Sequence, residues 1–462
     1  MVTYSFLALF LGLMGYVVYF QLRLSEDFIN NPYNTRQELF EDEVIRGEIV
    51  ASDGEVLART NVDADGNETR EYPYENLFAH VVGYSTVGKT GIESTANFHL
   101  LRSSAVSVEN AANDLTGEKS IGDTVVTTLD CALQQTAYDA LGNYDGAVVV
   151  MEPETGKILA MVSKPDFDPN ELAADWEYLT SEENESSVLV NRATQGLYPP
   201  GSTFKLFTML EYVHENEYYE NYSFSCSGSY TYDNKTIHCY NNKKHGTMDL
   251  KQALAYSCNS AFAEMGTSLD VARFGNLCGE LLFNTSLPSK LGAAKSSFVL
   301  EAGDAPEDVM ATAIGQGKTL VSPYHMALVM SAICNRGVLM TPYVVDHTTN
   351  YKGNIVKRFE PEEYGALMTE SDAELLKDYM HAVTSYGTAD ELGGQDYAAY
   401  GKTGSAEFSV GKSAHAWYVG FAHREDLPDI AVAVVVENVG TGSDYAVPIA
   451  KKIFDAYYES IP

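Results

Sequence analysis

The sequence predicts an α/β (α+β) fold in which a helical middle separates two groups of strands that form one sheet, with helices flanking it. Three patterns support this prediction. Strand-like segments begin the last two thirds of the chain, helical segments follow, and further strands and a closing helix end it. An apolar run and a mixed region come before this domain. The 462 residues are enough for two or three domains. We place them at residues 1–22, 23–130 and 131–462.

The apolar run covers residues 3–20, which carry no charge. Its length is near the lower limit for a helix that crosses a bilayer, about 17 residues. A cleaved signal peptide is the alternative, but no Ala-x-Ala-like cleavage site follows the run. We therefore expect an uncleaved, single-pass membrane helix at residues 1–22. Its flanks do not fix its orientation, because nothing basic precedes the run and Arg23 follows it.

The composition excludes one class of partner. The chain has 64 acidic and 30 basic residues, which gives a net charge of −34. Proteins that bind nucleic acids need a basic face against the phosphate backbone, so we expect no nucleic-acid partner. A local cationic site for a carboxylate remains compatible with this charge.

Residues 23–130 contain short strands and turns. Residues 46–58 alternate apolar and polar side chains around Asp53-Gly54, which predicts a hairpin. Residues 63–71 are polar and predict a loop. Residues 83–90 match the pattern of a phosphate-binding loop, and residues 77–82 could be the strand that such a loop requires. The following helix start is weak and no magnesium-binding Asp stands out, so we favour a connecting turn and keep nucleotide binding as an alternative.

The C-terminal domain shows its strands at both ends. Its expected elements are a helix at 132–141, a strand pair at 147–151 and 158–162, helices at 250–266 and 309–333, strands at 397–407, 416–422 and 430–437, and a last helix at 446–460. The second long helical segment is broken at residues 315–317. We expect the early and late strands to join in one sheet.

A Pro-Pro-Gly turn introduces the segment that carries the first candidate site. Pro199, Pro200 and Gly201 precede an apolar helical pattern, and Ser202 and Lys205 are three residues apart, so they share one side of the helix. A serine hydroxyl becomes a good nucleophile when a base takes its proton. A lysine can act as that base if burial or a second cation lowers its pKa. The spacing alone is common on helix surfaces.

The six cysteines leave several possibilities open. Cys226 and Cys239 flank a hairpin-like stretch, and outside the membrane they could form a disulfide, which we favour. Two free thiols are the main alternative. A zinc site that uses His238 or His245 is a third, although the spacing fits no standard pattern. The remaining cysteines are expected to be buried single thiols: Cys131, Cys258, Cys278 and Cys334. We expect no metal and no cofactor.

Three short motifs occur in order along the chain. They are Ser202-x-x-Lys205, Ser257-x-Asn259 and Lys402-Thr403-Gly404. Each is weak alone, but together they are typical of penicillin-binding proteins and serine β-lactamases. Over nearly its whole length the sequence resembles class B penicillin-binding proteins, and the penicillin-binding protein A group in particular. Further stretches carry the resemblance: Arg46-Gly47-x-Ile49 with Asp53-Gly54, Gly91-Ile92-Glu93, Tyr198 to Lys205, His245-Gly246, Gly315-Gln316-Gly317 and Ala414 to Phe421.

The resemblance implies an architecture. Residues 131–462 would form a serine-transpeptidase or β-lactamase-like domain whose central antiparallel sheet is flanked by helices. Residues 23–130 would form a pedestal, or dimerisation-like, region. Ala51 departs from the family, which often has an acidic residue at this position. About 110 residues before that domain are too few for a glycosyltransferase domain.

The resemblance also implies roles for the site residues. Ser202 would attack the carbonyl between two terminal D-alanines of a peptidoglycan stem peptide. Lys205, neutral because Lys402 lies nearby, would take the proton. Ser257 would relay a proton to the leaving amine, and Asn259 would hold the Lys205 amine and the substrate amide.

The remaining roles concern the strand that carries the third motif. Lys402, Thr403 and Ser405 would bind the terminal carboxylate of the substrate. Backbone N–H groups of Ser202 and Ser405 would form the oxyanion hole. Gly404 would let the substrate backbone approach the strand edge, where it can add as an extra strand.

We therefore expect a membrane-anchored D,D-transpeptidase whose catalytic domain lies outside the cytoplasm. β-Lactams would acylate it, and a glycosyltransferase of the elongation or division machinery is the expected partner. A D,D-carboxypeptidase or β-lactamase-like hydrolase is the first alternative. A non-catalytic β-lactam sensor or divisome scaffold is the second.

Overall fold

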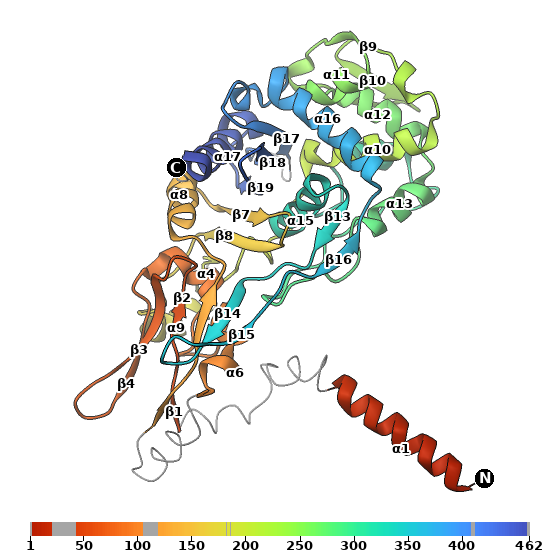
Figure 1. Ribbon diagram of the computed structural model, residues 1–462. Coiled ribbons are helices and arrows are strands. Elements are labelled where there is room, and N and C mark those ends of the chain that lie inside the picture. Colours follow the sequence, from red (N-terminus) through yellow and green to blue (C-terminus); the bar gives the residue numbers. More distant parts are fainter. Residues whose placement is uncertain are drawn as a thin grey trace.

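A computed structural model of the protein describes residues 2–20, 43–104, 119–181, 183–184, 186–407 and 412–459 (Figure 1). The N-terminal residues form helix α1 (Val2–Tyr19). Its apolar side chains are exposed, and Leu9 keeps 66% of its surface. Among the helices in these ranges, none has both the length and the apolar character needed to cross a bilayer. The structure therefore does not show the membrane helix expected at residues 1–22, of which residues 1, 21 and 22 lie outside the described ranges.

A five-stranded antiparallel sheet forms the centre of the C-terminal domain, as expected. Its order is β17-β18-β19-β7-β8, so the early and late strands meet where Val435 lies opposite Ala147. The strands are β7 (Gly146–Glu152), β8 (Lys157–Lys164), β17 (Ala398–Ala406), β18 (His415–Arg424) and β19 (Leu427–Val436). The middle strands are apolar and buried over nearly their whole length, which indicates that both faces of the sheet are covered.

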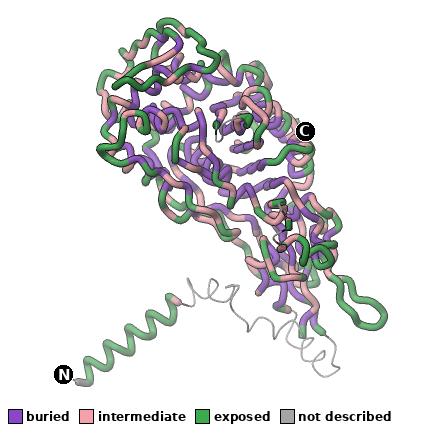
Figure 2. The backbone as a smooth tube through the Cα atoms, turned by 180° about the vertical axis from the view of Figure 1, so that it is seen from behind, coloured by how far each residue is buried: buried purple, intermediate pink, exposed green. Residues whose placement is uncertain are grey.

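Helices cover the two faces of this sheet. Helix α15 packs on β7 and β19, whereas α17 packs on β18 and β19 beside α8 (Figure 1). Their bounds are α8 (Cys131–Leu141), α15 (Pro323–Cys334) and α17 (Gly442–Glu459). The expected helices at 132–141 and 446–460 are thus present, although residue 460 lies outside the described ranges. Buried residues concentrate in this layered centre of the domain (Figure 2).

A helical part and a group of short strands lie beyond one end of the sheet (Figure 1). The helices are α10 (Lys205–Glu215), α11 (Leu250–Ala255), α12 (Asn259–Ser268), α13 (Val271–Glu280), α14 (Pro306–Ala313) and α16 (Glu370–Tyr386). The strands are β9 (Phe224–Cys226), β10 (Ser229–Tyr232), β11 (Lys235–His238) and β12 (Gly246–Met248). Strands β10 and β11 form the expected hairpin.

One expectation in this part is wrong. The segment 250–266 is not a continuous helix, because α11 ends at Ala255 and α12 begins at Asn259. Ser257 lies in the break with φ +54°, a left-handed conformation that few residues other than glycine adopt. Apolar periodicity continues across the break, so the sequence pattern could not reveal it.

The N-terminal region is organised by a six-stranded sheet of order β15-β14-β6-β2-β3-β4. Its strands are β2 (Ile49–Val50), β3 (Val56–Val62), β4 (Glu68–Glu71), β6 (Thr124–Thr127), β14 (Val345–Thr349) and β15 (Ile355–Arg358). Strands β2 and β3 form the expected hairpin around Asp53-Gly54. The loop expected at 63–71 is present only at residues 63–67, and the prediction is wrong for residues 68–71, which form β4 and pair with β3. Because β14 and β15 come from late in the chain, the boundary placed at residue 130 divides this sheet.

The remaining short elements described here connect these parts or lie at their edges. Two small strand pairs are formed by β1 (Val44–Ile45) with β5 (Ser120–Ile121) and by β13 (Val338–Met340) with β16 (Glu363–Ala366). The short helices are η3 (Glu75–Phe78), α4 (Ala79–Val82), α5 (Gly91–Thr95), α6 (Asn97–Leu100) and α9 (Leu172–Leu179).

The structure contradicts the phosphate-loop alternative at residues 83–90. Residues 75–82 are helical, in η3 and α4, so no strand leads into the loop. The loop also closes on itself, because a Cβ on Gly83 would come within 2.1 Å of the Thr90 carbonyl oxygen. A turn this tight leaves no room for a phosphate between its ends.

A buried ion cluster joins two of the family-like stretches in the N-terminal region. The Glu93 carboxylate is fully buried and accepts hydrogen bonds from Arg46 Nε at 2.6 Å and Arg70 Nε at 2.7 Å. The Tyr72 hydroxyl donates to the same carboxylate at 3.2 Å. The two arginines offset the burial of the carboxylate and hold its pKa below the usual value.

The N-terminal region and the catalytic domain share one continuous apolar core. Gln134 on α8 is a buried polar link between them. Its Nε2 donates to the Leu77 carbonyl oxygen at 2.8 Å and to the Met161 carbonyl oxygen at 2.9 Å. Buried amides are stable when their hydrogen bonds are made, so Gln134 fixes how the two parts meet.

Candidate active site

The turn before Ser202 is held by close backbone contacts. Gly201 has φ +54° and its N–H donates to the Gly315 carbonyl oxygen at 2.9 Å. A Cβ on Gly315 would come within 1.7 Å of the Gly201 carbonyl oxygen, which excludes every larger residue there. Trp417 Nε1 donates to the Pro199 carbonyl oxygen at 3.1 Å and anchors the other end of the turn. Trp417 is fully buried, as expected.

Ser202 lies in a 3₁₀ turn, η4 (Gly201–Phe204), that continues into α10. The expected turn into a helix is therefore present. The helix buries an apolar face in the domain core, formed by Phe204, Leu206, Phe207, Met209 and Leu210. That packing fixes the helix and presents Ser202 to a groove on the surface.

Lys205 is fully buried one turn further along and makes three hydrogen bonds. Its Nζ donates to Asn259 Oδ1 at 2.6 Å, to the Ser257 carbonyl oxygen at 2.8 Å and to Ser257 Oγ at 3.2 Å. A hydrogen bond to Ser202 is not among its contacts in the described part of the chain. Such contacts are often long in free enzymes and shorten in the reacting complex.

The Ser257 hydroxyl lies between two amines. Lys402 Nζ donates to Ser257 Oγ at 3.0 Å, and Lys205 Nζ donates to the same oxygen at 3.2 Å. Lys402 is also fully buried and donates to the Thr403 carbonyl oxygen at 3.0 Å. The left-handed conformation of Ser257 therefore has a local function, because it aims both the hydroxyl and the carbonyl of this residue at Lys205.

Burial lowers the pKa of Lys205 to about 8. Burial, and then the positive charge of Lys205, lower the pKa of Lys402 well below its ordinary value. We expected Lys402 to be the cause of a neutral Lys205, but removal from water is what lowers the pKa of Lys205, and Lys402 is not among the causes. At Lys402 removal from water is the larger of the two causes. Two buried ammonium groups that share one hydroxyl partner repel each other, so protonation of both is unfavourable. At least one of the two amines is therefore neutral near neutral pH.

Asn259 begins α12 and binds on two sides. Its Oδ1 accepts from Lys205, and its Nδ2 donates to the His238 carbonyl oxygen at 3.0 Å. The side chain thus connects the buried amine to the last residue of β11. This second contact leaves the amide fixed in one orientation.

The groove has a volume of about 1310 Å³, and six of the eight predicted site residues line it. These are Ser202, Ser257, Asn259, Thr403, Gly404 and Ser405. The two lysines lie beneath its floor. The structure therefore brings all eight predicted residues together, from three separate parts of the chain. Strand β17, which carries the third motif, is the edge strand of the central sheet.

Gly404 has a packing role in addition to the one we expected. A Cβ at this position would come within 2.9 Å of the Pro200 carbonyl oxygen and 3.0 Å of Trp417 Cβ. Gly404 is thus required for β17 to pack against the turn that carries Ser202. That its small size also admits the substrate backbone stays a prediction.

Three residues that support the site were not predicted. Thr388 Oγ1 lies 2.6 Å from Thr403 Oγ1, Gln316 Nε2 donates to the Ser405 carbonyl oxygen at 3.3 Å, and the Gly442 N–H donates to Ser405 Oγ at 3.3 Å. Only Gln316 had a sequence signal, in the Gly-Gln-Gly stretch. The other two stand alone in the sequence, and only the fold brings them to β17.

The expected disulfide between Cys226 and Cys239 is not formed, and both thiols are free. Cys258 and His245 lie beside them, and the four side chains could hold a metal ion. Cys258 was expected to be a single buried thiol.

The arrangement defines the chemistry in general terms. A serine at a helix start, a neutral amine, a bridging hydroxyl and an edge strand suit acyl transfer through a serine ester. Comparison with known proteins specifies the family. Residues 146–455 match the penicillin binding protein transpeptidase domain, and residues 46–125 match the penicillin binding protein A dimerisation domain. The chain belongs to the penicillin-binding protein transpeptidase family, in the class B group that the sequence resembles.

Relatives and solved structures agree with this assignment. The chain is 32% identical to the peptidoglycan D,D-transpeptidase PbpA of Mycolicibacterium smegmatis, over 91% of this chain and 90% of that protein. The D,D-transpeptidase domain of a peptidoglycan glycosyltransferase from Eggerthella lenta is 31% identical, with a TM-score of 0.80 over 90% of this chain and 99% of that one. The ceftriaxone acyl-enzyme complex of penicillin-binding protein A from Mycobacterium tuberculosis is 28% identical, with the same TM-score and coverage.

Proposed function

We propose that the protein is a peptidoglycan D,D-transpeptidase that cross-links stem peptides through an ester on Ser202 and that β-lactams inhibit by acylating the same hydroxyl. The placement of Ser257 Oγ between Lys205 Nζ and Lys402 Nζ, at 3.2 and 3.0 Å, carries this proposal. It provides a base for the nucleophile and a route for its proton. The names of the relatives and the acyl-enzyme structures support it.

In the acylation step Ser202 Oγ attacks the carbonyl carbon between the two terminal D-alanines. The neutral Lys205 amine takes the hydroxyl proton as the new C–O bond forms. Ser257 Oγ then passes a proton from the lysine pair to the amide nitrogen, the C–N bond breaks and D-alanine leaves. Backbone N–H groups of Ser202 and Ser405 would stabilise the oxyanion.

The second step uses an amine of a neighbouring stem peptide. It attacks the ester carbonyl and gives one N–H proton to the neutral lysine pair. A new amide forms as the ester C–O bond breaks, and Ser202 Oγ recovers that proton from the lysine pair. Water must be poorly placed for this outcome, since it would otherwise hydrolyse the ester. The edge position of β17 supports binding of the donor as an added strand, with its terminal carboxylate at Lys402, Thr403 and Ser405.

The reaction products formed from a peptide donor distinguish a transpeptidase from a hydrolase or a non-catalytic sensor. The protein is incubated with a pentapeptide donor and an excess of a labelled D-amino acid, and the products are separated by mass. We expect the label to replace the terminal D-alanine, with little free tetrapeptide. Mainly tetrapeptide, with fast release of hydrolysed penicillin, would establish a hydrolase. A stable penicillin adduct without turnover of any donor would favour a sensor or scaffold.

The proposal includes attachment to the cell membrane as a single-pass protein, with the catalytic domain outside the cytoplasm. The uncharged run at residues 3–20 and the exposed apolar side chains of α1 support it, because such surface is rarely left in water. Fractionation of cells that express the full chain is the test. Release by high salt or carbonate would contradict an integral anchor.

We also propose a glycosyltransferase partner from the elongation or division machinery. The reaction itself supports this, since cross-linking needs a supply of new glycan strands. Covalent capture in cells, with a photoreactive residue in the N-terminal region, tests it. Recovery of a glycosyltransferase is expected, and capture that yields only other proteins would contradict the partnership.

A further inference from the structure

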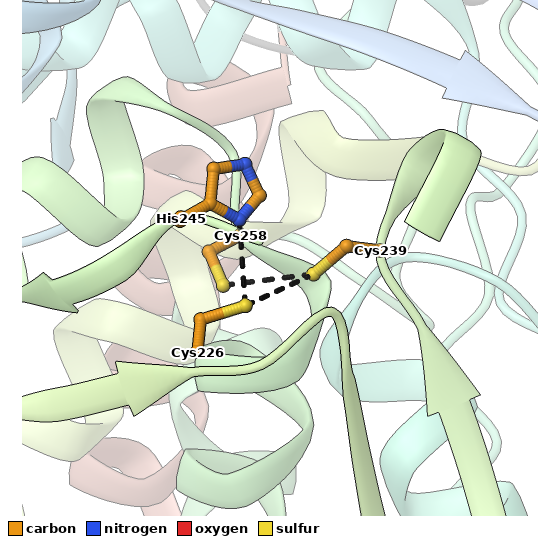
Figure 3. A group of neighbouring side chains, drawn as sticks. All are labelled: Cys226, Cys239, His245 and Cys258. Carbon is orange, nitrogen blue, oxygen red and sulfur yellow. Dashed lines mark hydrogen bonds between the residues drawn. The ribbon is translucent and has the colours of Figure 1, made fainter. Parts of the chain in front are cut away.

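Three thiols and one imidazole converge beside the active site, outside the residues that the mechanism uses (Figure 3). They belong to Cys226, Cys239, Cys258 and His245, which come from β9, the loop after β11, the turn before α12 and the loop before β12. All four potential ligand atoms lie within 4.8 Å of one another. The three cysteines are buried and His245 is partly exposed.

The separations of these atoms have the size of a tetrahedral site. Cys226 Sγ lies 3.6 Å from Cys239 Sγ, Cys239 Sγ lies 3.7 Å from Cys258 Sγ, and Cys226 Sγ lies 3.5 Å from His245 Nδ1. Zinc bonds of about 2.3 Å to sulfur and about 2.0–2.1 Å to nitrogen give tetrahedron edges of about 3.8 Å between sulfurs and about 3.6 Å between sulfur and nitrogen. These three contacts agree with the expected edges to about 0.2 Å, and the other three separations are at most 4.8 Å.

We propose that Cys226, Cys239, His245 and Cys258 bind one Zn²⁺ ion as a structural site. Four protein ligands close the coordination sphere, which is typical of structural rather than catalytic zinc. The donors are soft sulfurs and one imidazole, with no carboxylate, and this set excludes Mg²⁺ and Ca²⁺ as natural occupants. These four residues do not follow a standard zinc-binding spacing. The fourth ligand, Cys258, lies inside the Ser257-x-Asn259 motif.

Hydrogen-bond donors and a helix N-terminus around the cysteines would stabilise the negative charge of thiolate ligands. The Gly228 N–H donates to Cys226 Sγ at 3.4 Å, and Ser260 Oγ lies 3.1 Å from Cys239 Sγ. Cys258 is the N-cap residue of α12, a ten-residue helix whose positive end favours a thiolate. Hydrogen bonds and a helix dipole around ligand sulfurs are usual features of metal sites in proteins.

The ion would act on the active site through position. Cys258 lies between Ser257, which binds both lysines, and Asn259, which binds Lys205. Cys239 follows His238, whose carbonyl oxygen accepts from Asn259 Nδ2. Zinc would therefore fasten the second catalytic motif to the segment 236–245 that lines one side of the groove. The four ligands are positioning residues, since none of them needs to touch the substrate.

The test begins with metal content. The full-length protein is purified in detergent, dialysed against buffer with limiting zinc, and analysed by elemental mass spectrometry. We expect one zinc per chain in the wild type and almost none in the Cys226→Ser/Cys239→Ser double variant. Cys278→Ala, which removes a buried thiol from α13, is the matched control and should keep the metal.

Two further measurements do not depend on a folded double variant. Cobalt substituted into the wild type should show sulfur-to-cobalt charge-transfer and tetrahedral ligand-field bands. His245→Cys, which keeps a fourth ligand, should also retain one metal ion per chain. Wild type that binds zinc only weakly, or that forms a Cys226–Cys239 disulfide instead, would overturn the proposal.

The effect on the active site is measured separately. A chelator should slow acylation of Ser202 by a fluorescent penicillin, and zinc should restore the rate. A protein that holds zinc but shows no transpeptidation would contradict the proposed reaction and leave the metal site intact. Unchanged acylation after complete removal of zinc would refute the positioning role.

Discussion

The pH dependence of acylation follows from the buried amine. If the neutral form of Lys205 is the base and its pKa is about 8, the neutral fraction is about 0.09 at pH 7 and about 0.91 at pH 9. The rate of acylation should therefore rise about tenfold between these values and level off above them. The sign follows from burial, which lowers the pKa, so activity is lost as pH falls through it. The apparent pKa belongs to the coupled pair of Lys205 and Lys402.

The assay is the second-order rate constant for acylation by a fluorescent penicillin, measured from pH 6 to 10 at constant ionic strength. Lys402→Met is the informative variant, because it removes the second amine, which is one partner of Ser257. It should change both the rate and the apparent pKa. A rate that stays flat from pH 7 to pH 9 would refute the reasoning. So would a decline over that range, since a protonated lysine would then be the active form.

Three further predictions concern stability and packing. Glu93→Gln should destabilise the N-terminal region by about 3–5 kcal/mol, because two buried arginines lose their counter-charge. Calorimetry measures the loss of stability, and an unchanged melting temperature would contradict the prediction. Gly404→Ala should lower the acylation rate at least tenfold, since the new Cβ would lie within 2.9 Å of the Pro200 carbonyl oxygen; a wild-type rate would refute this. Burial lowers the pKa of His325 to about 4. The neutral imidazole therefore stabilises the fold fully above pH 6.5, and this stabilisation is lost as pH falls toward 4. In His325→Gln the melting temperature should fall less over that range.

The catalytic fold could be predicted because its signals are local. The strand pair at 147–162 and the late strands are apolar runs with turn residues between them, and β17 to β19 appeared where expected. The Pro-Pro-Gly turn marked the helix of Ser202 for the same reason. The order of strands then allowed only a few ways to form one sheet.

The rest depended on contacts between distant parts of the chain. The left-handed Ser257 is stabilised by two lysines, one of them 145 residues away, and periodicity carries no trace of that. Strands β14 and β15 join the N-terminal sheet although more than 200 residues separate them from β6. Cys258 looked like an isolated apolar thiol because its partners come from other loops.

The central claim is that one hydroxyl, on Ser202, carries the acyl group. Wild type and Ser202→Ala are treated with benzylpenicillin, and intact mass and peptide mapping locate the adduct. We predict one penicilloyl group per chain on the peptide that contains Ser202, and none in the variant. An adduct of the same stoichiometry in Ser202→Ala, or one mapped to another residue in the wild type, would contradict the account.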